Sequence, residues 1–315
     1  MMRYINAILL TGFLFSASQV FAELTFPMHP QQVAPNVYAL ITPTRDLPNP
    51  ENKGWNSNSA FVVTNAGVLL FDTGSSSAIG ESIKKVIAQI TDQPVRWIIN
   101  SHAHGDHWLG NAVFKDTVEA IYATEPVQKK IIEDGQGWVK RFMQMTEGAT
   151  GQSEILVPEN MIDQRTTIRF GDREGVLFLS DNSHSAGDIL MWLEDEKVLI
   201  SGDVIYSDRM PSTLDSNLTQ WVLLLDELNA LQPEVVIPGH GKVTDIQGVM
   251  RLKALLQSFW DAVKKGYDAG QSDFEMVGDV TAALAEFEPH YPGLQEKVKR
   301  DISGVFLQVE AASFE

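Results

Sequence analysis

The chain has 315 residues, of which 44% are hydrophobic, and a formal net charge of −17 at pH 7. Such a chain can bury a sizeable core, either as one large α/β domain or as two small ones. The acidity disfavours a nucleic-acid partner or an anionic lipid surface, and the absence of cysteine excludes disulfides and thiolate nucleophiles.

Residues 1–22 have the pattern of a secretory signal. Arg3 precedes an apolar stretch, and Val20 and Ala22 stand at the −3 and −1 positions of a cleavage site. We expect cleavage after Ala22, a periplasmic or secreted protein, and a single domain over residues 23–315. The apolar stretch is short for a membrane span, so no membrane insertion is expected once the signal is removed; an uncleaved anchor is the alternative.

The first half of the chain alternates apolar runs with segments of helical spacing. Expected strands cover Val37–Thr42, Ala60–Thr64, Val68–Asp72, Val95–Asn100 and Glu119–Ala123. Expected helices cover Ala78–Thr91, Leu109–Phe114 and Glu125–Met145, the last broken near residues 134–137, where two glycines lie close together. The polar segment 43–58 is expected to form a long loop.

The second half repeats this order of strands followed by helices. Expected strands cover residues 166–170, 175–180, 188–194, 197–201 and 234–237. Expected helices cover Thr219–Leu231, Ile246–Gly266, Asp273–Phe287 and Leu294–Ala312. The repetition predicts two similar halves that form one sandwich of sheets with helices outside.

One short loop concentrates side chains that bind metals. His102, His104, Asp106 and His107 fall within six consecutive positions, and imidazole with carboxylate suits zinc, iron or manganese. Alternation along an extended chain puts His102 and His104 on one side, and Gly105 allows a sharp turn before the other two. The loop could therefore supply two neighbouring metals; the alternative is a polar loop with surface histidines.

Three further candidates follow other apolar strands. His184 lies in a turn between two strands, Asp203 follows the next one, and His240 lies in a Pro-Gly-His-Gly sequence after another. Because loops at strand ends present side chains to a shared edge, we expect these residues to join the histidine loop. His29 and His290 sit beside prolines in polar stretches and are expected to be ordinary surface residues.

Together these motifs resemble the metallo-β-lactamase-fold hydrolase superfamily. The matching residues are Asp72 in Asp-Thr-Gly, the His-x-His-x-Asp-His run at 102–107, His184 in His-Ser-Ala-Gly-Asp, Asp203 in Ser-Gly-Asp and His240 in Pro-Gly-His-Gly. The resemblance implies an α/β fold, a four-layer αββα sandwich with a dinuclear metal site at one edge of its two sheets. The implied ligands are His102, His104 and His184 on one metal, Asp106, His107 and His240 on the other, and Asp203 bridging both.

The resemblance also implies the chemistry. Two divalent ions would share a hydroxide that attacks the substrate, and Asp106 would orient this hydroxide and later collect a proton. Zinc is the default metal, with iron or manganese as alternatives. Tyr206 follows Asp203 at the offset where lactonases of the superfamily that act on acylated homoserine lactones place a tyrosine near the substrate oxygen. It is predicted to stabilise a developing oxyanion; a half-buried loop tyrosine is the alternative.

Other residues near the motifs have two interpretations each. Asp72 either accepts a hydrogen bond from a ligand or simply forms the turn. Trp55 is expected to lie over an apolar part of the substrate, because the loop 43–58 and the segment 207–217 are the predicted walls of the site. Lys242 either meets a substrate carboxylate or is a solvated lysine.

The sequence favours a metal-dependent hydrolase of a small-molecule ester, lactone, amide or thioester. β-Lactam hydrolysis is an alternative, disfavoured because the familiar classes carry cysteine or serine where this chain has Asp203. A second alternative is a metal-dependent oxidoreductase or accessory protein of a periplasmic quinoprotein or sulfur-oxidation system. The tracts 35–38, 58–63 and 104–111, together with the signal peptide, resemble exported zinc metallohydrolases linked to such systems. The sequence does not indicate an oligomeric state.

Overall fold

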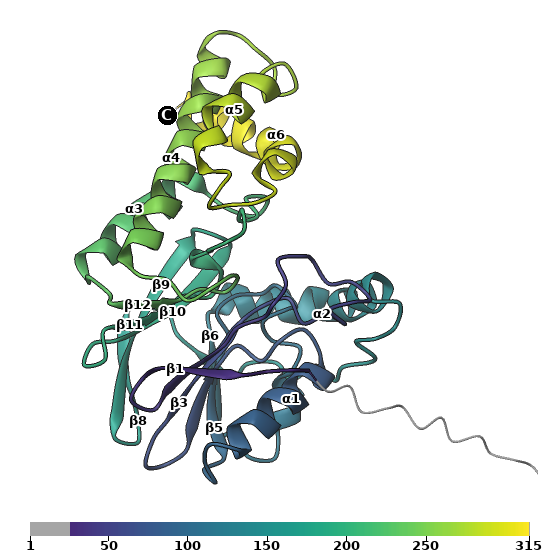
Figure 1. The fold of residues 1–315 in the computed structure, drawn as a ribbon, viewed down its shortest axis with the longest axis vertical. Helices are drawn as coiled ribbons and strands as arrows, with labels where there is room; N and C mark the ends of the chain where they lie inside the picture. Colours follow the sequence, from purple (N-terminus) through teal and green to yellow (C-terminus); the bar gives the residue numbers. More distant parts are fainter. Residues whose placement is uncertain (1–25, 315) are drawn as a thin grey trace, which may run out of the picture.

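Two β-sheets lie face to face in the computed structural model (Figure 1), which describes residues 26–314. The predicted signal and its cleavage site lie outside the described residues. In spatial order, the first sheet consists of β1 (Pro30–Ala34), β2 (Val37–Leu40), β3 (Ser59–Val63), β4 (Val68–Phe71), β5 (Val95–Ile99), β6 (Ala120–Ala123) and β7 (Asn160–Met161). The second sheet consists of β12 (Val235–Ile237), β11 (Val198–Ile200), β10 (Ala186–Leu193), β9 (Arg173–Asn182) and β8 (Thr166–Phe170).

Six α-helices cover the outer faces of the described part. They are α1 (Ser77–Ala88), α2 (Glu125–Met145), α3 (Leu218–Ala230), α4 (Ile246–Asp268), α5 (Val277–Ala283) and α6 (Leu294–Ala312). The helices α1 and α2 lie beside the first sheet, whereas α3 to α6 stack beyond the second (Figure 1). Within residues 26–314, no helix combines the length and the apolarity that crossing a bilayer requires.

Alternating side chains of the strands build the layers. Leu70 of β4 packs in a cluster with Ile83 of α1, whereas the next residue, Phe71, packs with Met191 of β10 between the sheets. On the outer face of β10, Leu190 joins the cluster formed with α3 to α6. The predicted four-layer αββα sandwich is therefore confirmed.

Some expected elements differ from the observed ones. The helix α2 is not broken at residues 134–137 but runs through them. The apolar stripe that includes Ile131 and Val139 packs in the core and outweighs the helix cost of glycine, about 1 kcal/mol each. Gly135 itself is needed there, because a Cβ would lie 2.8 Å from Ile155 and 3.1 Å from Trp108.

The edges of the fold account for the other differences. The strand β1 was not expected, because its sequence is polar and begins with proline. The segment predicted as a helix over residues 273–287 contains only the short α5 and a 3₁₀ turn at 285–287. The expected helix at 109–114 is a 3₁₀ turn over Asn111–Phe114.

The strand directions bring the candidate loops to one edge. In the first sheet β4, β5 and β6 run parallel, so the histidine loop leaves the carboxyl end of a central strand. In the second sheet β11 and β12 are also parallel, and the loops after them carry Asp203 and His240. The turn between β9 and β10 carries His184. Carboxyl ends of parallel strands meet at the same edge, which is where sites in α/β folds lie.

Candidate metal centre

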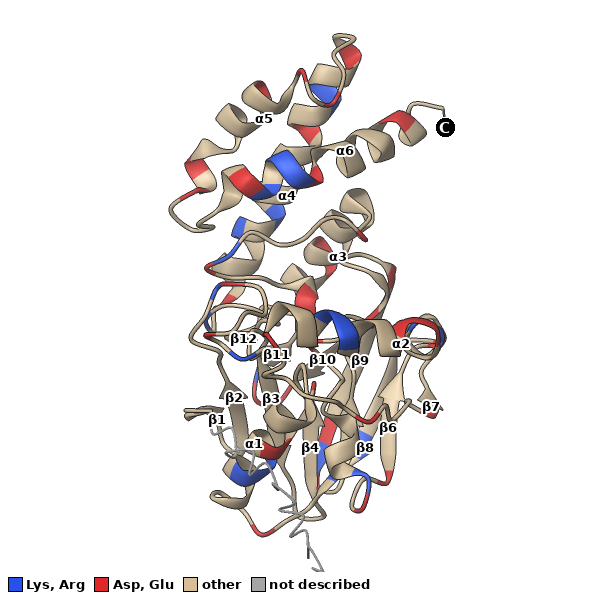
Figure 2. Ribbon diagram, turned by 90° about the vertical axis from the view of Figure 1, so that its right-hand side faces the viewer, with Lys and Arg blue, Asp and Glu red and all other residues tan. Residues whose placement is uncertain are grey.

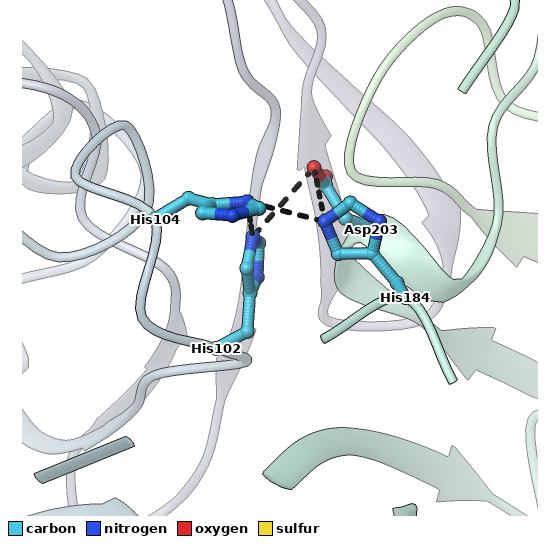
Figure 3. Close-up of side chains that lie close together, drawn as sticks. All are labelled: His102, His104, His184 and Asp203. Atoms are coloured by element: carbon cyan, nitrogen blue, oxygen red, sulfur yellow. Dashed lines mark hydrogen bonds and ion pairs between the residues drawn. The ribbon is translucent and has the colours of Figure 1, made fainter. Parts of the chain in front are cut away.

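The first group of side chains joins the histidine loop to the second sheet. The Nε2 atom of His102 lies 3.0 Å from Nδ1 of His104, which lies 3.1 Å from Nε2 of His184. The Oδ2 atom of Asp203 lies 3.6 Å from the His102 nitrogen and 3.5 Å from the His184 nitrogen. Figure 3 shows these four side chains pointing toward a common centre.

A second group lies next to the first and shares its aspartate. The Oδ2 atom of Asp106 lies 3.8 Å from Nε2 of His107 and 3.5 Å from Nε2 of His240. Asp203 reaches this group with both oxygens, because Oδ1 lies 3.2 Å from the His107 nitrogen and Oδ2 lies 3.3 Å from the His240 nitrogen. The structure thus brings all the predicted ligands together, in the two predicted sets, with Asp203 between them.

The two groups fit divalent metal ions. Tetrahedral zinc with bonds of about 2.0–2.1 Å to nitrogen places its ligand atoms about 3.3 Å apart, and the distances above fall around this value. The Nε2 atom of His107 and the Oδ1 atom of Asp203 are buried and have no hydrogen-bond partner in the described chain. Buried polar atoms normally have partners, so atoms left free at a convergence of ligands indicate an ion. The imidazole and carboxylate set accepts zinc, iron or manganese.

Asp72 holds one histidine of each group. Its carboxylate accepts a hydrogen bond from Nδ1 of His107 at 2.8 Å, and from the Ser101 backbone and hydroxyl at 2.8 and 2.7 Å. The Ser101 hydroxyl oxygen in turn accepts one from Nδ1 of His102 at 2.8 Å. These bonds fix the tautomers that leave each Nε2 free for a metal. Asp72 has a φ of +60°, a strained conformation for a non-glycine residue. Of the two interpretations of Asp72, the structure favours an acceptor for a predicted ligand histidine.

Two other predicted ligand histidines also have outer partners. Nδ1 of His240 donates to the backbone oxygen of Asn56 at 2.7 Å, and the Asn56 side-chain amide donates to Asp106 at 2.9 Å. Nε2 of His104 donates to Asp215 at 3.1 Å, so this histidine turns Nδ1 toward the group. Nδ1 of His184 has no hydrogen-bond partner among the described residues. Asn56 and Asp215 could not be found from sequence, because a single polar residue in a loop carries no spacing signal.

The charges of the site favour a bound cation. Burial would raise the pKa of the Asp203 carboxyl, but the neighbouring imidazoles, His240 first, hold that pKa well below its usual value. Burial opposes protonation of His107, yet the surrounding carboxylates, Asp203 first, raise its pKa well above the usual value. Burial lowers the pKa of His184 to about 3. Ionised carboxylates and a neutral His184 are the forms that bind metals, and a metal would displace the proton from His107.

Tyr206 lies in the site but not as expected. Its hydroxyl donates to Oδ2 of Asp203 at 2.5 Å, and its ring stacks on His240 with the centroids 5.1 Å apart. The residue is buried, and burial raises the pKa of its hydroxyl well above the usual value, so it stays a donor. The proton predicted to meet a substrate oxyanion is used to hold Asp203.

The predicted substrate contact of Trp55 is wrong, and the structure decides between the two interpretations of Lys242. Trp55 is buried in the cluster between α1 and the first sheet, where its ring meets the edge of Phe26 at 6.0 Å. A large indole is more stable in this core than at a wet cavity. Lys242 is exposed and pairs with Asp208 at 2.9 Å, outside the cavity over the metal groups. It is therefore a solvated lysine, the second of the two interpretations given above.

A cavity of about 160 Å³ opens over both groups, beside a larger one of about 470 Å³ along α2. His104, Trp138, Arg141 and Asp215 line both cavities. The Trp138 ring lies 5.7 Å from that of His104, so this helix residue takes the aromatic position expected of Trp55. Residues of the two loops predicted as walls, 43–58 and 207–217, line the smaller cavity as expected.

The chain is similar to a metallo-beta-lactamase and to an alkylsulfatase. Residues 52–240 match the family model described as the metallo-beta-lactamase superfamily. The chain is 25% identical over 285 residues to a linear primary-alkylsulfatase of Pseudomonas sp., a match that covers 76% of this chain and 53% of that protein. It is 23% identical over 193 residues to metallo-beta-lactamase IND-1 of Chryseobacterium indologenes, covering 60% of this chain and 73% of that one. The chain thus spans about half the length of the alkylsulfatase it matches.

Solved structures share the fold. A metallo-beta-lactamase from Pontibacter korlensis superposes with a TM-score of 0.60 at 21% identity, over 73% of this chain and 99% of that one. A sec-alkylsulfatase from Pseudomonas sp. superposes with a TM-score of 0.67 at 13% identity, over 91% of this chain and 52% of that one. Because residues 52–240 are more than half of the chain, the protein belongs to the metallo-beta-lactamase superfamily.

Proposed function

We propose that the protein is a hydrolase that uses two divalent metal ions, with zinc as the default, against a small-molecule substrate. The observation that carries this proposal is the pair of His/Asp groups that share Asp203 below a cavity. Divalent ions held there would supply a water-derived nucleophile near neutral pH and polarise the bond under attack. Retention of both complete ligand sets supports an enzyme rather than a protein that only has the fold.

The chain's own residues have separate roles in this proposal. Asp203 holds the two groups at a fixed distance, and the Tyr206 hydroxyl holds Asp203. Asp106 faces the cavity with one oxygen fixed by Asn56, so its carboxylate can orient a water molecule and accept a proton from it. Tyr206 acts through Asp203 and is a positioning residue.

Two kinds of bond are candidates for cleavage. The first is the carboxylic ester, lactone, amide or thioester that the sequence favours. The second is a sulfate ester, which the match to a linear primary-alkylsulfatase over 76% of the chain favours. The alkylsulfatase structure also superposes over 91% of the chain, whereas the lactamase structure superposes over 73%. β-Lactam cleavage and a redox role remain the alternatives.

The test is metal analysis followed by a substrate panel. We expect about two zinc ions for each chain and hydrolysis of one substrate class in a panel of carboxylic ester, lactone, thioester, β-lactam, phosphoester and sulfate ester. Dialysis against a chelator should abolish this activity, and added zinc should restore it.

The same experiment can contradict the proposal. Bound iron with consumption of O₂ would support the redox alternative instead. Equal hydrolysis before and after complete metal removal would also exclude the proposed mechanism.

A further inference from the structure

Three cationic side chains, apart from Arg141 of α2, line the cavity over the metal groups. Arg209 comes from the loop after Asp203, and Lys297 and Arg300 come from α6. The two helix residues are three positions apart and so lie on the same face. These three residues, called here the cationic wall, stand on a protein that is acidic overall and whose acidic segments are spread over the ribbon (Figure 2).

Arg209 is a buried charge without a carboxylate partner in the described chain. Its side chain is 7% exposed, and its one polar contact is NH1 at 3.1 Å from Nδ1 of His240. That nitrogen already donates its proton to the Asn56 backbone oxygen, so it cannot also accept one from the guanidinium. A buried guanidinium without an acceptor is costly, and its N–H groups are therefore available to a ligand in the cavity.

Lys297 is the second cation without a partner. Within residues 26–314, its ammonium has no hydrogen bond and no ion pair. Burial first, and then the charges of Arg209 and Arg300, lower its pKa to about 8, against the opposing charges of Asp301 and Asp203. Like-charged groups that crowd a desolvated lysine favour the arrival of an anion.

The helix and the loop are held together, so the spacing of these cations is set by the fold. The buried carboxylate of Asp301 accepts hydrogen bonds from the Thr213 backbone at 3.0 Å and from its hydroxyl at 3.3 Å. The Arg300 guanidinium donates two hydrogen bonds to the carboxylate of Asp301, at 2.5 and 3.0 Å. It donates a third to the Ser212 hydroxyl at 3.2 Å. Arg300 is thus an anchored member of the cationic wall, whereas Arg209 and Lys297 are free to bind.

We propose that Arg209 and Lys297 form a subsite for an anionic group of the substrate, a carboxylate or a sulfate-like group, beside the bond that is cleaved. Exposed Leu47 and Leu214 on the two loops of the cavity mouth would contact an apolar part of the same molecule. The proposal rests on the proposed hydrolase function and specifies its substrate as an anionic, partly apolar molecule. It assigns a binding role to α6, which lies outside the residues 52–240 that match the family model.

The test is calorimetric binding of butyrate and butanesulfonate to the metal-loaded protein. The two probes carry the same chain on a carboxylate or a sulfonate, and neither has an ester to cleave. Lys297→Met should weaken binding of the preferred probe about tenfold or more, because a charge-assisted hydrogen bond is lost. Lys299→Met is the matched control, since Lys299 is an exposed α6 residue that pairs with Glu296 at 2.8 Å. Its binding should equal that of the wild type.

The probes also separate the two sources of the anion. Tighter binding of butanesulfonate indicates a sulfate-like group, and tighter binding of butyrate indicates a carboxylate. Arg209→Gln should weaken binding as Lys297→Met does, with the metal content of each variant measured alongside.

Equal binding by wild type, Lys297→Met and Lys299→Met would overturn the subsite, and so would the absence of binding to the metal-loaded wild type. Because neither probe is a substrate, this result is independent of hydrolysis. A protein that binds the probes but cleaves no ester would contradict the proposed function and leave the subsite standing.

Discussion

The two His/Asp groups at the floor of the cavity differ from the cationic wall beside them in whether their side chains have partners within the protein. On the floor, most of the predicted ligand histidines have an outer partner, and Asp72, Ser101 and Asn56 among these partners are buried. On the wall, Arg209 and Lys297 have no carboxylate partner among residues 26–314. The floor is therefore oriented before any ligand arrives, whereas the wall keeps its charges for a ligand. This difference predicts which substitutions abolish metal binding and which change only recognition.

The largest effect is expected at the residue that the two metal groups share. Asp203→Ala removes oxygens that lie 3.2–3.6 Å from four ligand nitrogens. We expect the loss of at least one metal for each chain and a fall in hydrolysis of at least about a hundredfold, since even outer partners of metals contribute about 10–100-fold. Metal analysis measures the loss of metal, and hydrolysis rates on the preferred substrate measure the loss of activity. Asp116→Ala, at an exposed position, is the control, and full activity of Asp203→Ala would refute the bridging role.

Asp72 should come next, because it orients both groups without touching a metal. Asp72→Asn replaces one acceptor oxygen by an amide N–H donor. That donor would face two other donors, Nδ1 of His107 and the Ser101 hydroxyl, so their hydrogen bonds would be lost. Metal affinity should fall about 10–100-fold at both sites. Competition with a chromogenic chelator measures this change, with Asp92→Asn at an exposed position as the control. Loss of affinity at one site alone would show that Asp72 does not couple the two groups.

The floor could be predicted from sequence, and the reason is physical. The chain has only seven histidines, and three of them lie with Asp106 within six positions around Gly105, so the ligand loop stands out. Strand ends marked by glycine then locate His184, Asp203 and His240. Four-layer architecture follows from the alternation of strands and helices, together with the family resemblance carried by these motifs.

The wall could not be predicted, because nothing in the local sequence distinguishes it. Arg209 lies in an irregular loop, and Lys297 is one of several charged residues on α6. Only the tertiary contact between Asp301 and Thr213 brings the two cations to one cavity. The prediction for Trp55 fails for a related reason, because an aromatic side chain in a loop can equally well fill a core.

A smaller effect is expected on stability from the wall itself. The pKa of Lys297 is about 8 in the folded protein against an ordinary 10.5, so the unfolded chain binds more protons between these values. The free energy of unfolding therefore rises with pH across this window. Below pH 8 the lysine is charged in both states, and the full destabilisation from its buried charge is present. Removing the charge should therefore stabilise the protein at pH 7, on the order of 2 kcal/mol after discounting for partial exposure.

Urea unfolding of Lys297→Met and wild type, at pH 7 and at pH 10 with equal metal content, tests this prediction. The advantage of the variant should shrink at pH 10, where the wild-type lysine is largely neutral in the folded state. Asp203 and Asp301 partly offset the repulsion from Arg209 and Arg300. Lys299→Met, which removes a paired surface charge, should change stability little at either pH. A variant less stable than wild type at pH 7 would mean that Lys297 has a stabilising partner.

The smallest effect on the floor is expected at Asp215, which contrasts with Asp72. Both carboxylates accept a hydrogen bond from a ligand histidine, but the Asp215 side chain is 68% exposed and that of Asp72 is 2% exposed. Water can replace an exposed acceptor, and exposed ion pairs contribute little. Asp215→Asn should therefore weaken metal binding no more than about fivefold, and only in the group that contains His104. Competition with a chelator measures the metal affinity of Asp215→Asn, which is then compared with that of Asp72→Asn. A loss as large as that of Asp72→Asn would show that burial does not decide how strongly an outer partner supports its metal.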